Sequence, residues 1–348
     1  MIRQETFLKQ KGLVSMATVR DIARAAGVSP ATVSRVLNGH PHVAEELRER
    51  VTRVAGELGY TGAARRRART GTGVVALIVP HVSSPFYCEV LAGVEREAYQ
   101  NEYGLVFYTT DGRSHDNVIE RALETPQLAG LVVITPRWRE DEQLLDHPEA
   151  PPVVVVDHRN AGSPYPHVVV DNLRGAYRAA QYLLAKGYDD IAMIRGPENI
   201  QSSMDRVRGF MLAMHEAFAA GLARARDLSD RIWPGDFEQR SGYEAVAGRL
   251  AAGEPMPRAI FCANDLMALG AVAALHEAGL RVPDDVAVMG FDDLPLAAAA
   301  VPPLTTVRQP VAEMGAIAFR MVTRLAAGQT LETERIVLDT ELVVRRSA

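Results

Sequence analysis

Three short stretches combine residue types that hydrolytic enzymes use, and in each of them the spacing is wrong for catalysis. HEAF at 215–218 and HEAG at 276–279 begin like a helical zinc motif, but neither has the second histidine four residues after the first. SHD at 114–116 places three triad-type residues consecutively, where their side chains cannot align as nucleophile, base and orienting acid. The sequence also has no phosphate-binding glycine loop and no nucleophile elbow. We therefore expect no enzyme activity, no cofactor and no bound metal.

A second group of polar residues follows predicted strands, where binding chemistry is more plausible than catalysis. Asn264 comes directly after AIFCA (259–263), and Asp292 comes directly after VAVMGF (286–291). In open parallel sheets, ligands bind in the crevice at the carboxyl ends of the strands. An amide can donate and accept at once, and a carboxylate accepts from two adjacent hydroxyls. Asp157 and Asp171 also end apolar runs, but such a carboxylate often caps the next helix, and capping is at least as probable for Asp171.

The elements that would position these residues alternate between apolar runs and amphipathic stretches. Continuous apolar runs are typical of parallel strands covered by helices on both faces. The runs lie at 74–80, 105–110, 131–135, 153–157, 191–195, 259–263 and 286–291. Helices are predicted over 85–100, 172–186, 203–220, 240–252 and 264–278, the last ending at Gly279.

These strands are too many for one comfortable sheet, so we predict two doubly wound lobes with a ligand crevice between them. The predicted core covers residues 73–348. Its first lobe takes about 73–168 and 303–332, and its second lobe takes about 169–302 and 333–348. Residues 1–16 are predicted to form an N-terminal extension, and the basic segment 61–72, which includes RRRAR, is predicted to be a linker.

The segment 17–60 has a different pattern, with short helices hinged at a glycine. Thr18 and Asp21 have capping-box spacing, so a helix should start at Val19. Gly27 supplies the left-handed turn, and a second helix starts with Ser29 as N-cap and proline at its first position. A third helix, from about Glu45 to Leu58, would close the small core. Two helices joined steeply by such a turn are the helix-turn-helix, whose second helix enters the major groove of DNA.

Charge is distributed unequally along the chain. Through Thr70 there are 13 basic and 6 acidic side chains, a formal charge of +7, whereas the rest has 25 basic and 37 acidic, a formal charge of −12. A cationic segment suits a polyanion because each neutralised phosphate releases counterions. The chain has no long apolar span and no signal-peptide pattern, so we expect a cytoplasmic protein without a membrane partner. Only Cys88 and Cys262 occur, both in apolar runs, and we expect both to be core residues.

The stretch TVRDIARAAGVSPATVSRVLNG (18–39) closely resembles the DNA-binding headpiece of the LacI/GalR family of bacterial transcriptional regulators. The resemblance continues through LGY (58–60), SSPFY (83–87), VVVDN (168–172), RVRGF (206–210), GDFEQRSGYEA (235–245), FCANDLMALG (261–270), GLRVPDDVAVMGFDDLPLA (279–297) and PPLTTVRQPVAEMG (302–315). It thus spans nearly the whole chain from Thr18 onward. It implies an all-α helix-turn-helix headpiece followed by an α/β core of two doubly wound lobes, similar to type I periplasmic binding proteins.

The resemblance also assigns DNA contacts. Arg35 is placed to read a guanine, because a guanidinium can donate twice to O6 and N7. Pro30 and Ala31 face bases through shape or a thymine methyl, while Ser29, Thr32, Ser34 and Asn38 contact phosphates. In the family the linker inserts a leucine into the minor groove. Here YTGAARRRARTGTG contains no leucine and lacks the usual Pro-Asn start. Its arginines enter a narrow minor groove or contact phosphates; these are Arg65, Arg66, Arg67 and Arg69.

Carried over position by position, the family's pocket falls on a small set of residues. Arg206, Asn264 and Asp292 are the polar candidates, and the fork of Arg206 suits a hydroxyl pair or a carboxylate. Aromatic walls for a sugar or a planar base would come from Phe86, Tyr87 and Phe237, and Asp157 is a weaker polar candidate. His81 stands where many relatives carry an aspartate, so either the ligand differs from theirs or His81 is an ordinary surface residue.

The function implied is sequence-specific repression, with affinity for DNA changed allosterically by a small molecule such as a sugar. A headpiece of this size reads few base pairs, so a near-palindromic operator and a symmetric homodimer, or a higher assembly, are expected. The alternative is a ligand-independent DNA-binding protein with a vestigial sugar-binding core. A transport binding protein is disfavoured because the chain has a cationic head and no signal peptide.

Overall fold

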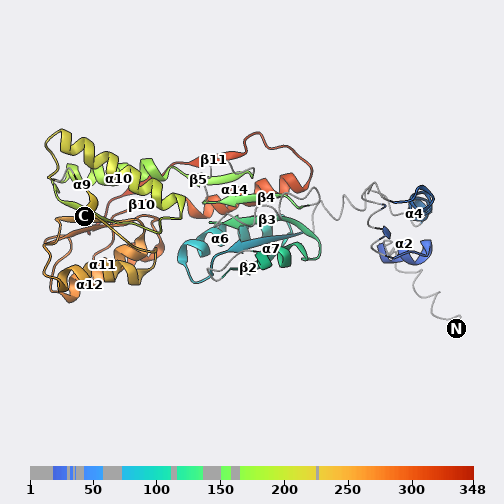
Figure 1. The fold of residues 1–348 in the computed structure, drawn as a ribbon, viewed down its shortest axis with the longest axis horizontal. Helices are drawn as coiled ribbons and strands as arrows, with labels where there is room; N and C mark the ends of the chain where they lie inside the picture. The colour runs from blue at the N-terminus through green and yellow to red at the C-terminus, as the bar shows by residue number, and fades with distance from the viewer. Residues whose placement is uncertain are drawn as a thin grey trace. The chain divides into compact units, whose positions relative to one another are not determined.

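A computed structural model of the 348-residue chain describes most of the protein (Figure 1). The described residues are 19–29, 32–33, 36, 43–57, 73–110, 116–135, 150–157, 165–224 and 227–348, without the side chains of 19–21 and 116–117. The chain divides into two compact units, Met1–Thr72 and Gly73–Ala348. Each unit has its own apolar core and is considered separately.

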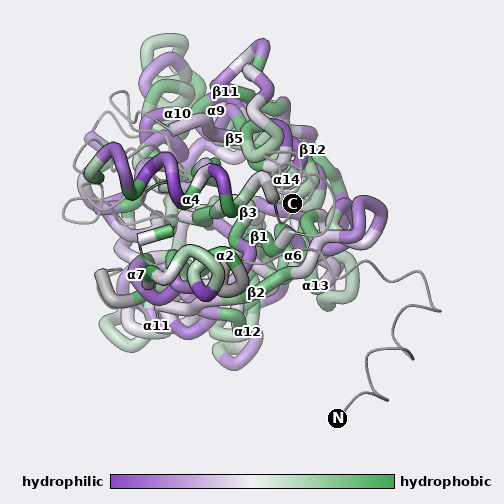
Figure 2. The backbone as a smooth tube through the Cα atoms, turned by 90° about the vertical axis from the view of Figure 1, so that its right-hand side faces the viewer, coloured by the Kyte–Doolittle hydropathy of each residue, from purple (hydrophilic) through white to green (hydrophobic). Residues whose placement is uncertain are grey.

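The first unit is built on helices α2 (Val19–Ala26) and α4 (Glu45–Glu57). Its core contains Ile22, Ala23 and Ala26 of α2 together with Val51, Val54 and Ala55 of α4, and Val33 and Val36 from between the helices are buried with them. Hydrophilic and hydrophobic segments alternate along α4 in Figure 2, as expected for a helix that buries one face. The two predicted helices therefore form where the sequence placed them.

The turn after α2 also has the predicted geometry. Gly27 has φ = +65°, in the left-handed region that glycine adopts without strain. The Ser29 hydroxyl accepts a hydrogen bond from the Thr32 amide at 3.1 Å, which is the N-cap contact expected at the start of the second helix. The predicted capping side chains of Thr18 and Asp21 lie outside the described part of the chain.

The second unit contains two parallel sheets with helices on their faces. The six-stranded sheet has the order β11-β5-β4-β3-β1-β2, and the four-stranded sheet has the order β7-β6-β8-β9. The strands of the first are β1 (Val74–Val79), β2 (Gly104–Thr109), β3 (Leu128–Ile134), β4 (Val153–Val156), β5 (His167–Val170) and β11 (Arg335–Leu338). Those of the second are β6 (Ile191–Ile194), β7 (Ile232–Trp233), β8 (Ala259–Cys262) and β9 (Ala287–Met289). An antiparallel pair, β10 (Thr306–Arg308) and β12 (Glu341–Val343), completes the strands.

The central strands of the first sheet, β1, β3 and β4, are buried on both faces, which explains their continuous apolar sequences. Val75, Leu77 and Val79 of β1 belong to the core beneath α6 (Pro85–Gln100) and α14 (Val311–Ala326). Ala76 and Ile78, pointing the other way, belong to the core beneath α7 (Asp116–Leu123). The second lobe is covered by α9 (Asn172–Ala185), α10 (Gln201–Ala219), α11 (Gln239–Ala251), α12 (Asp265–Glu277) and α13 (Pro295–Ala299), with a one-turn 3-10 helix at Ser229–Arg231. Together they form the predicted two doubly wound lobes.

The chain crosses between the lobes three times. It passes from β5 to α9, from β10 to α14, and from β11 to β12, whose partner β10 packs with α9. The prediction that 333–348 belong to the second lobe was wrong for β11, because Arg335–Leu338 pair in parallel with His167–Val170. The same pairing places β5 wholly in the first sheet, so the second lobe begins at Asp171 rather than at 169. β11 is a partly exposed edge strand whose apolar run, residues 336–338, is only three residues long, so a search for longer apolar runs misses it. The prediction that the first lobe resumes at 303 was also wrong, because Leu304 and Val307 belong to the core of the second lobe and the first lobe resumes at α14.

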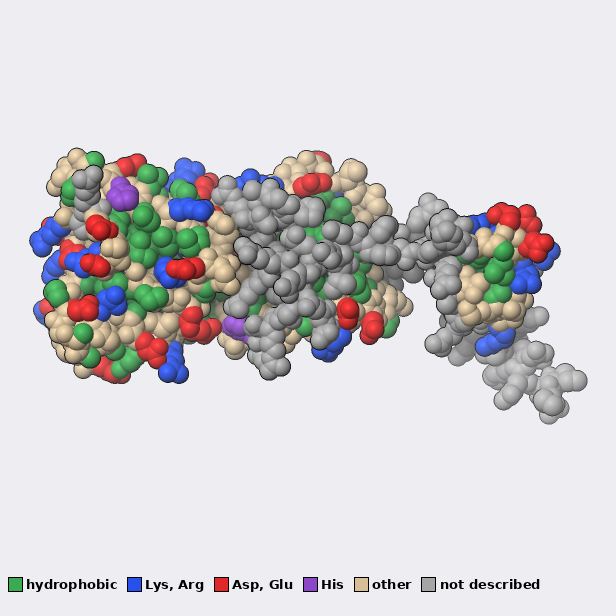
Figure 3. All heavy atoms as spheres, viewed as in Figure 1, with side chains coloured by type: hydrophobic (Ala, Val, Ile, Leu, Met, Phe, Trp, Pro, Cys, Tyr) green, Lys and Arg blue, Asp and Glu red, His purple; other side chains and the backbone are tan. Residues whose placement is uncertain are grey.

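Charged side chains of both signs are mixed over the visible face of the second lobe (Figure 3). Cys262 is buried as expected, but Cys88 is exposed on α6, so its assignment to the core was wrong. Among the described helices, none is long and apolar enough to cross a membrane. The described residues also contain no cluster of three or more His, Cys, Asp or Glu that could hold a metal ion.

Helices on the second lobe approach one another at glycines. A Cβ on Gly242 of α11 would collide with the backbone of Met267 on α12, and a Cβ on Gly270 of α12 would collide with the backbone of Gln239 on α11. Gly209 of α10 meets the backbone of Leu173 in the same way. The helix pairs α11/α12 and α9/α10 therefore depend on residues without a Cβ.

This packing predicts opposite outcomes for two glycines on one helix. Gly242→Ala should lower the stability of the core by about 1–3 kcal/mol, because neither backbone can move away without repacking the lobe. Gly248→Ala is the matched control: no described atom outside its own helix lies within 4 Å of its Cβ, so it should leave stability unchanged or raise it by up to about 1 kcal/mol. Thermal unfolding of both variants tests the packing, and equal melting temperatures would contradict it.

Candidate functional site

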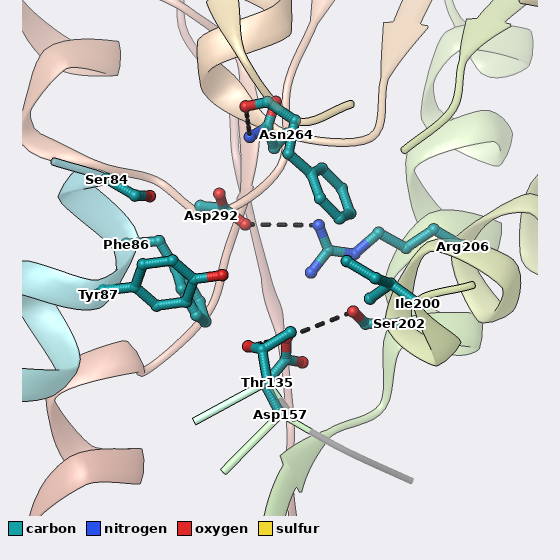
Figure 4. A pocket seen from close by; sticks show the side chains of 11 residues that line it. Ser84, Phe86, Tyr87, Thr135, Asp157, Ile200, Ser202, Arg206, Asn264 and Asp292 are labelled. Atoms are coloured by element: carbon teal, nitrogen blue, oxygen red, sulfur yellow. Dashed lines mark hydrogen bonds and ion pairs between the residues drawn. The ribbon is translucent and has the colours of Figure 1, made fainter. Parts of the chain in front are cut away.

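A cavity of about 390 Å³, open to solvent, lies between the two lobes of the second unit (Figure 4). It is lined by Ser84, Phe86, Tyr87, Thr135, Asp157, Ile200, Ser202, Arg206, Phe237, Asn264 and Asp292. Thr135 and Asp157 follow β3 and β4, and Asn264 and Asp292 follow β8 and β9, so strand ends of both sheets reach it. Seven of the eight predicted pocket residues are brought together here, and only His81 is absent from the lining.

Arg206 is the buried centre of the site. Its side chain is 4% exposed, and its guanidinium projects from α10 toward Asp292 (Figure 4). The Nε atom donates to Asn172 Oδ1 at 2.8 Å, and Nη1 donates to the carbonyl of Ala263. The Arg206 Cζ atom also lies 3.9 Å from the ring centroid of Phe291. Burial lowers the pKa of Arg206, whereas nearby carboxyl groups oppose that shift. These groups, rather than water, therefore stabilise the buried cation.

Asp292 is the nearest charged partner of Arg206. Its Oδ1 lies 3.5 Å from Arg206 Nη1 and accepts a hydrogen bond from Gln309 Nε2 at 2.6 Å. Burial raises the pKa of Asp292 to about 7, although Arg206 and Gln309 both act to lower it. Close to neutral pH this carboxyl is therefore partly protonated and partly ionised. A ligand that donates hydrogen bonds to it favours the ionised form.

Asp157 supplies a second carboxyl from the first lobe. Its Oδ2 accepts from Thr135 Oγ1 and from Ser202 Oγ, each at 3.3 Å, and the second of these bonds joins the two lobes. Its Oδ1 is buried and has no hydrogen-bond partner among the described residues. Burial raises the pKa of Asp157 to about 6. A buried acceptor without a partner is costly, and a ligand hydroxyl could satisfy it.

A third carboxyl, Asp265, lies behind the cavity and stabilises its frame. It accepts hydrogen bonds from Thr306 Oγ1 at 2.5 Å and from the Leu294 amide at 2.8 Å. Burial, with Asp292 nearby, raises its pKa well above the ordinary value.

Asn264 acts first as a structural residue. Its amide oxygen accepts from the Met267 amide at 2.9 Å and caps α12, and its amide nitrogen donates to the carbonyl of Phe237 at 2.8 Å. Asp171 likewise caps α9 through the Arg174 amide, as the capping alternative proposed. Asn264 therefore positions Phe237 in the lining as well as lining the cavity itself.

Aromatic side chains face the polar cluster from two sides. Phe86 and Tyr87 lie at the start of α6, opposite Arg206 in Figure 4, and their ring centroids are 5.5 Å apart at 75°. The Phe237 ring lies against Gly196, where a Cβ would collide with it, and its centroid is 5.8 Å from Arg206 Cζ. The cavity thus combines apolar ring surface with a small number of fixed polar groups, the usual composition of a small-molecule site.

The backbone around the cavity is unusually strained. Seven described residues other than glycine have positive φ, and four of them line the cavity: Thr135 (47°), Asp157 (58°), Phe237 (72°) and Asp292 (118°). For β-branched and bulky residues this conformation is costly and persists only where the surroundings impose it. Strain of this kind concentrates at functional sites, which supports a binding role for the cavity.

His81 occupies a different position from the one predicted. Its Nδ1 lies 3.0 Å from Ser83 Oγ, and its Nε2 lies 3.8 Å from Glu238 Oε1. With Tyr87 and Phe237 it lines a second cavity adjoining the first. His81 stands two residues beyond the end of β1, and its ring nitrogens face Ser83 and Glu238 rather than Arg206.

Several residues of the site were not predicted from the sequence. Thr135 directly follows the run LVVI and could have been found by the strand-end rule that identified Asn264. Ser202 and Ile200 stand at the start of α10, where no motif signals them. The buried supports Asn172 and Gln309 were also missed, because only the fold brings them to Arg206 and Asp292.

The predicted DNA contacts are only partly described. Ser29 is exposed, its hydroxyl lies 2.8 Å from Thr32 Oγ1, and both stand at the start of the second helix of the headpiece. The other predicted contacts lie outside the described residues: Pro30, Ala31, Ser34, Arg35, Asn38, Arg65, Arg66, Arg67 and Arg69.

Comparison with known proteins identifies both units. Residues 18–62 match the family model "Bacterial regulatory proteins, lacI family", and residues 180–348 match "Periplasmic binding protein-like domain". The regulator DegA of Bacillus subtilis (strain 168) is 36% identical over 338 residues, which cover 95% of this chain and 97% of DegA. The fold and the helical headpiece therefore define a DNA-binding transcriptional regulator, not an enzyme. The chain belongs to the LacI family.

Two solved structures show the same architecture. A complex of the regulator CelR with cellobiose has a TM-score of 0.69 and 34% identity, covering 95% of this chain and all of that one. A Lac repressor dimer bound to operator and the anti-inducer ONPF has a TM-score of 0.66 and 26% identity, covering 95% of this chain and 98% of that one. The headpiece and the two-lobed core predicted from the sequence are thereby confirmed.

The buried Asp157 carboxyl should lower the stability of the ligand-free protein when it is ionised. A carboxyl whose pKa is about 6 in the folded protein and 3.8 otherwise gives stability that is fully present below pH 3.8 and lost as pH rises through 6. Asp157→Asn removes this loss, so at pH 8 the ligand-free variant should be more stable than the wild type by up to about 3 kcal/mol. The gain should shrink as pH falls from 6 toward 4.

Thermal unfolding between pH 4 and pH 8 measures this effect. The exposed Asp339→Asn is the matched control, since its loss should change stability by no more than about 0.5 kcal/mol at any pH. A melting temperature of Asp157→Asn below that of the wild type at pH 8 would show that the ionised carboxylate stabilises the lobes.

Proposed function

We propose that this protein is a repressor whose affinity for a near-palindromic operator is changed by a neutral, polyhydroxylated effector, a sugar or a close relative, bound between the lobes. The single observation that carries the proposal is the arrangement of Asp157, Arg206 and Asp292 around one cavity. One buried cation and two titrating carboxyls offer both donors and acceptors at fixed positions. Adjacent hydroxyls of a sugar donate to carboxylates and accept from a guanidinium.

The charges of the site argue against other effector classes. An anionic effector would meet two carboxyls, and its attraction to Arg206 is already offset by Asp292 at 3.5 Å. An apolar effector would leave the acceptor Asp157 Oδ1 without a partner. The rings of Phe86, Tyr87 and Phe237 suit the apolar face of a sugar. A similar regulator agrees with this class, since CelR forms a complex with cellobiose.

The proposed mechanism couples the cavity to the lobes. The Ser202–Asp157 hydrogen bond joins the lobes beside the cavity, so an effector that contacts both carboxyls stabilises one relative arrangement of the lobes. In a symmetric dimer this arrangement sets the spacing of two headpieces and hence the affinity for a two-fold operator. By linkage, operator binding changes effector affinity by the same factor. We place this activity in the bacterial cytoplasm, at the operator.

One experiment with two variants tests both ends of the mechanism. Fluorescence anisotropy measures binding to a labelled duplex from the protein's own promoter region, with random duplex as competitor, across a panel of sugars. Arg35→Ala should weaken specific binding by about 1–3 kcal/mol, roughly 5- to 150-fold, and leave nonspecific binding nearly unchanged. Asp292→Asn should keep operator affinity but lose the response to the effector.

The outcomes separate the proposal from its rivals. A sugar that shifts operator affinity in the wild type but not in Asp292→Asn supports it. Specific operator binding that no sugar changes favours the ligand-independent regulator with a vestigial core. Unchanged affinity and specificity after Arg35→Ala would remove that residue from base recognition.

A further inference from the structure

The cavity around Arg206 continues into an outer compartment. A second cavity of about 440 Å³ shares Ser84, Tyr87, Thr135, Ile200 and Phe237 with the first and is therefore contiguous with it. It adds Pro80, His81, Pro197, Asp236 and Glu238, none of which touches the inner cavity. The first two come from the first lobe and the other three from the second, so this compartment also spans the lobes.

The outer compartment has its own polar groups. The His81 and Glu238 side chains are 36% and 53% exposed, and His81 Nε2 lies 3.8 Å from Glu238 Oε1 across the gap between the lobes. Asp236 is exposed beside them, and its Oδ1 accepts from the Glu238 amide at 2.9 Å, which fixes the loop before α11. An imidazole and two carboxyl groups can donate hydrogen bonds to sugar hydroxyls and accept hydrogen bonds from them.

Aromatic and proline surfaces separate and frame the two compartments. Tyr87 and Phe237 line both of them, and the His81 ring meets Tyr87 edge-on with centroids 5.3 Å apart. Pro80 and Pro197 flank the outer one. Two small sites thus lie end to end, each with its own hydrogen-bonding groups and with shared ring surfaces at the junction.

We propose that the outer compartment is a second sugar subsite and that the effector has two linked rings, as in a disaccharide. The inner ring binds Asp157, Arg206 and Asp292, and the outer ring lies against the His81–Glu238 pair and binds both side chains. This inference rests on the proposed function, because it assumes a polyhydroxylated effector in the inner cavity. In this proposal, His81 and Glu238 determine that an effector with two rings binds more tightly than an effector with one.

Calorimetric titration of the full-length protein tests this subsite. The probes are glucose, galactose and xylose, together with the disaccharides cellobiose, maltose, lactose and xylobiose. At least one disaccharide should bind about tenfold or more tightly than its constituent monosaccharides. His81→Ala and Glu238→Gln should each remove most of this preference, while the affinity for the monosaccharide stays within about twofold of the wild type.

Two further variants distinguish failure of the subsite from failure of the proposed function. Asp292→Asn should weaken monosaccharides and disaccharides alike, because it acts in the inner cavity. Glu244→Gln removes an exposed carboxylate that pairs with Arg240 on the same helix, outside both cavities, and should change nothing. Circular dichroism melting curves confirm that each variant is folded.

Each result has a definite meaning. A monosaccharide that binds as tightly as every disaccharide containing it, or a preference that survives both outer substitutions, overturns the second subsite and leaves the proposed function intact. Binding of none of these sugars, at concentrations up to the millimolar range, overturns both. Loss of preference in His81→Ala and Glu238→Gln, with Glu244→Gln unchanged, supports the two-ring effector.

Discussion

The structure of the core depends on one buried guanidinium. Arg206 is removed from water between two lobes, where an uncompensated charge would cost several kcal/mol. The compensation comes from four directions: the Asn172 side chain, the Ala263 carbonyl, the Asp292 carboxyl and the face of Phe291. These partners lie at the start of α9, the end of β8 and the end of β9. Arg206 therefore links three segments of the second lobe to one another.

This constraint explains why the site is both strained and reactive to protons. Asp292, which pairs with Arg206, has φ = 118°, and Asp157 has φ = 58° at the end of β4. Burial raises the pKa of Asp157 to about 6 and that of Asp292 to about 7, so a ligand that donates hydrogen bonds to these carboxyls can change their ionisation near neutral pH. The folded protein thus maintains acceptors that it cannot fully satisfy by itself. An effector that satisfies them recovers that cost as binding energy, which is how a preorganised site gains affinity.

Much of this arrangement could be predicted from residues alone. Strand-end placement found Asn264 and Asp292, because apolar runs mark buried parallel strands and ligands meet their carboxyl ends. The capping role of Asp171 followed from its position before a helix. What could not be predicted depends on tertiary contact: Asn172 and Gln309 support the site from segments that the fold alone makes neighbours. β11 was assigned to the wrong lobe because its apolar run, residues 336–338, is short and only the fold pairs it with β5. His81 was set one compartment too deep because the sequence does not show which cavity a side chain after a strand reaches.

Proton linkage tests most directly whether the effector binds the ionised carboxyls around Arg206. Calorimetric binding of the selected sugar at pH 6.5, in two buffers of different ionisation enthalpy, gives the number of protons exchanged. The account predicts a net release of up to about one proton per site, because a hydroxyl donor lowers the pKa of Asp292 and Asp157 on binding. Binding without proton release, or with proton uptake, would contradict it.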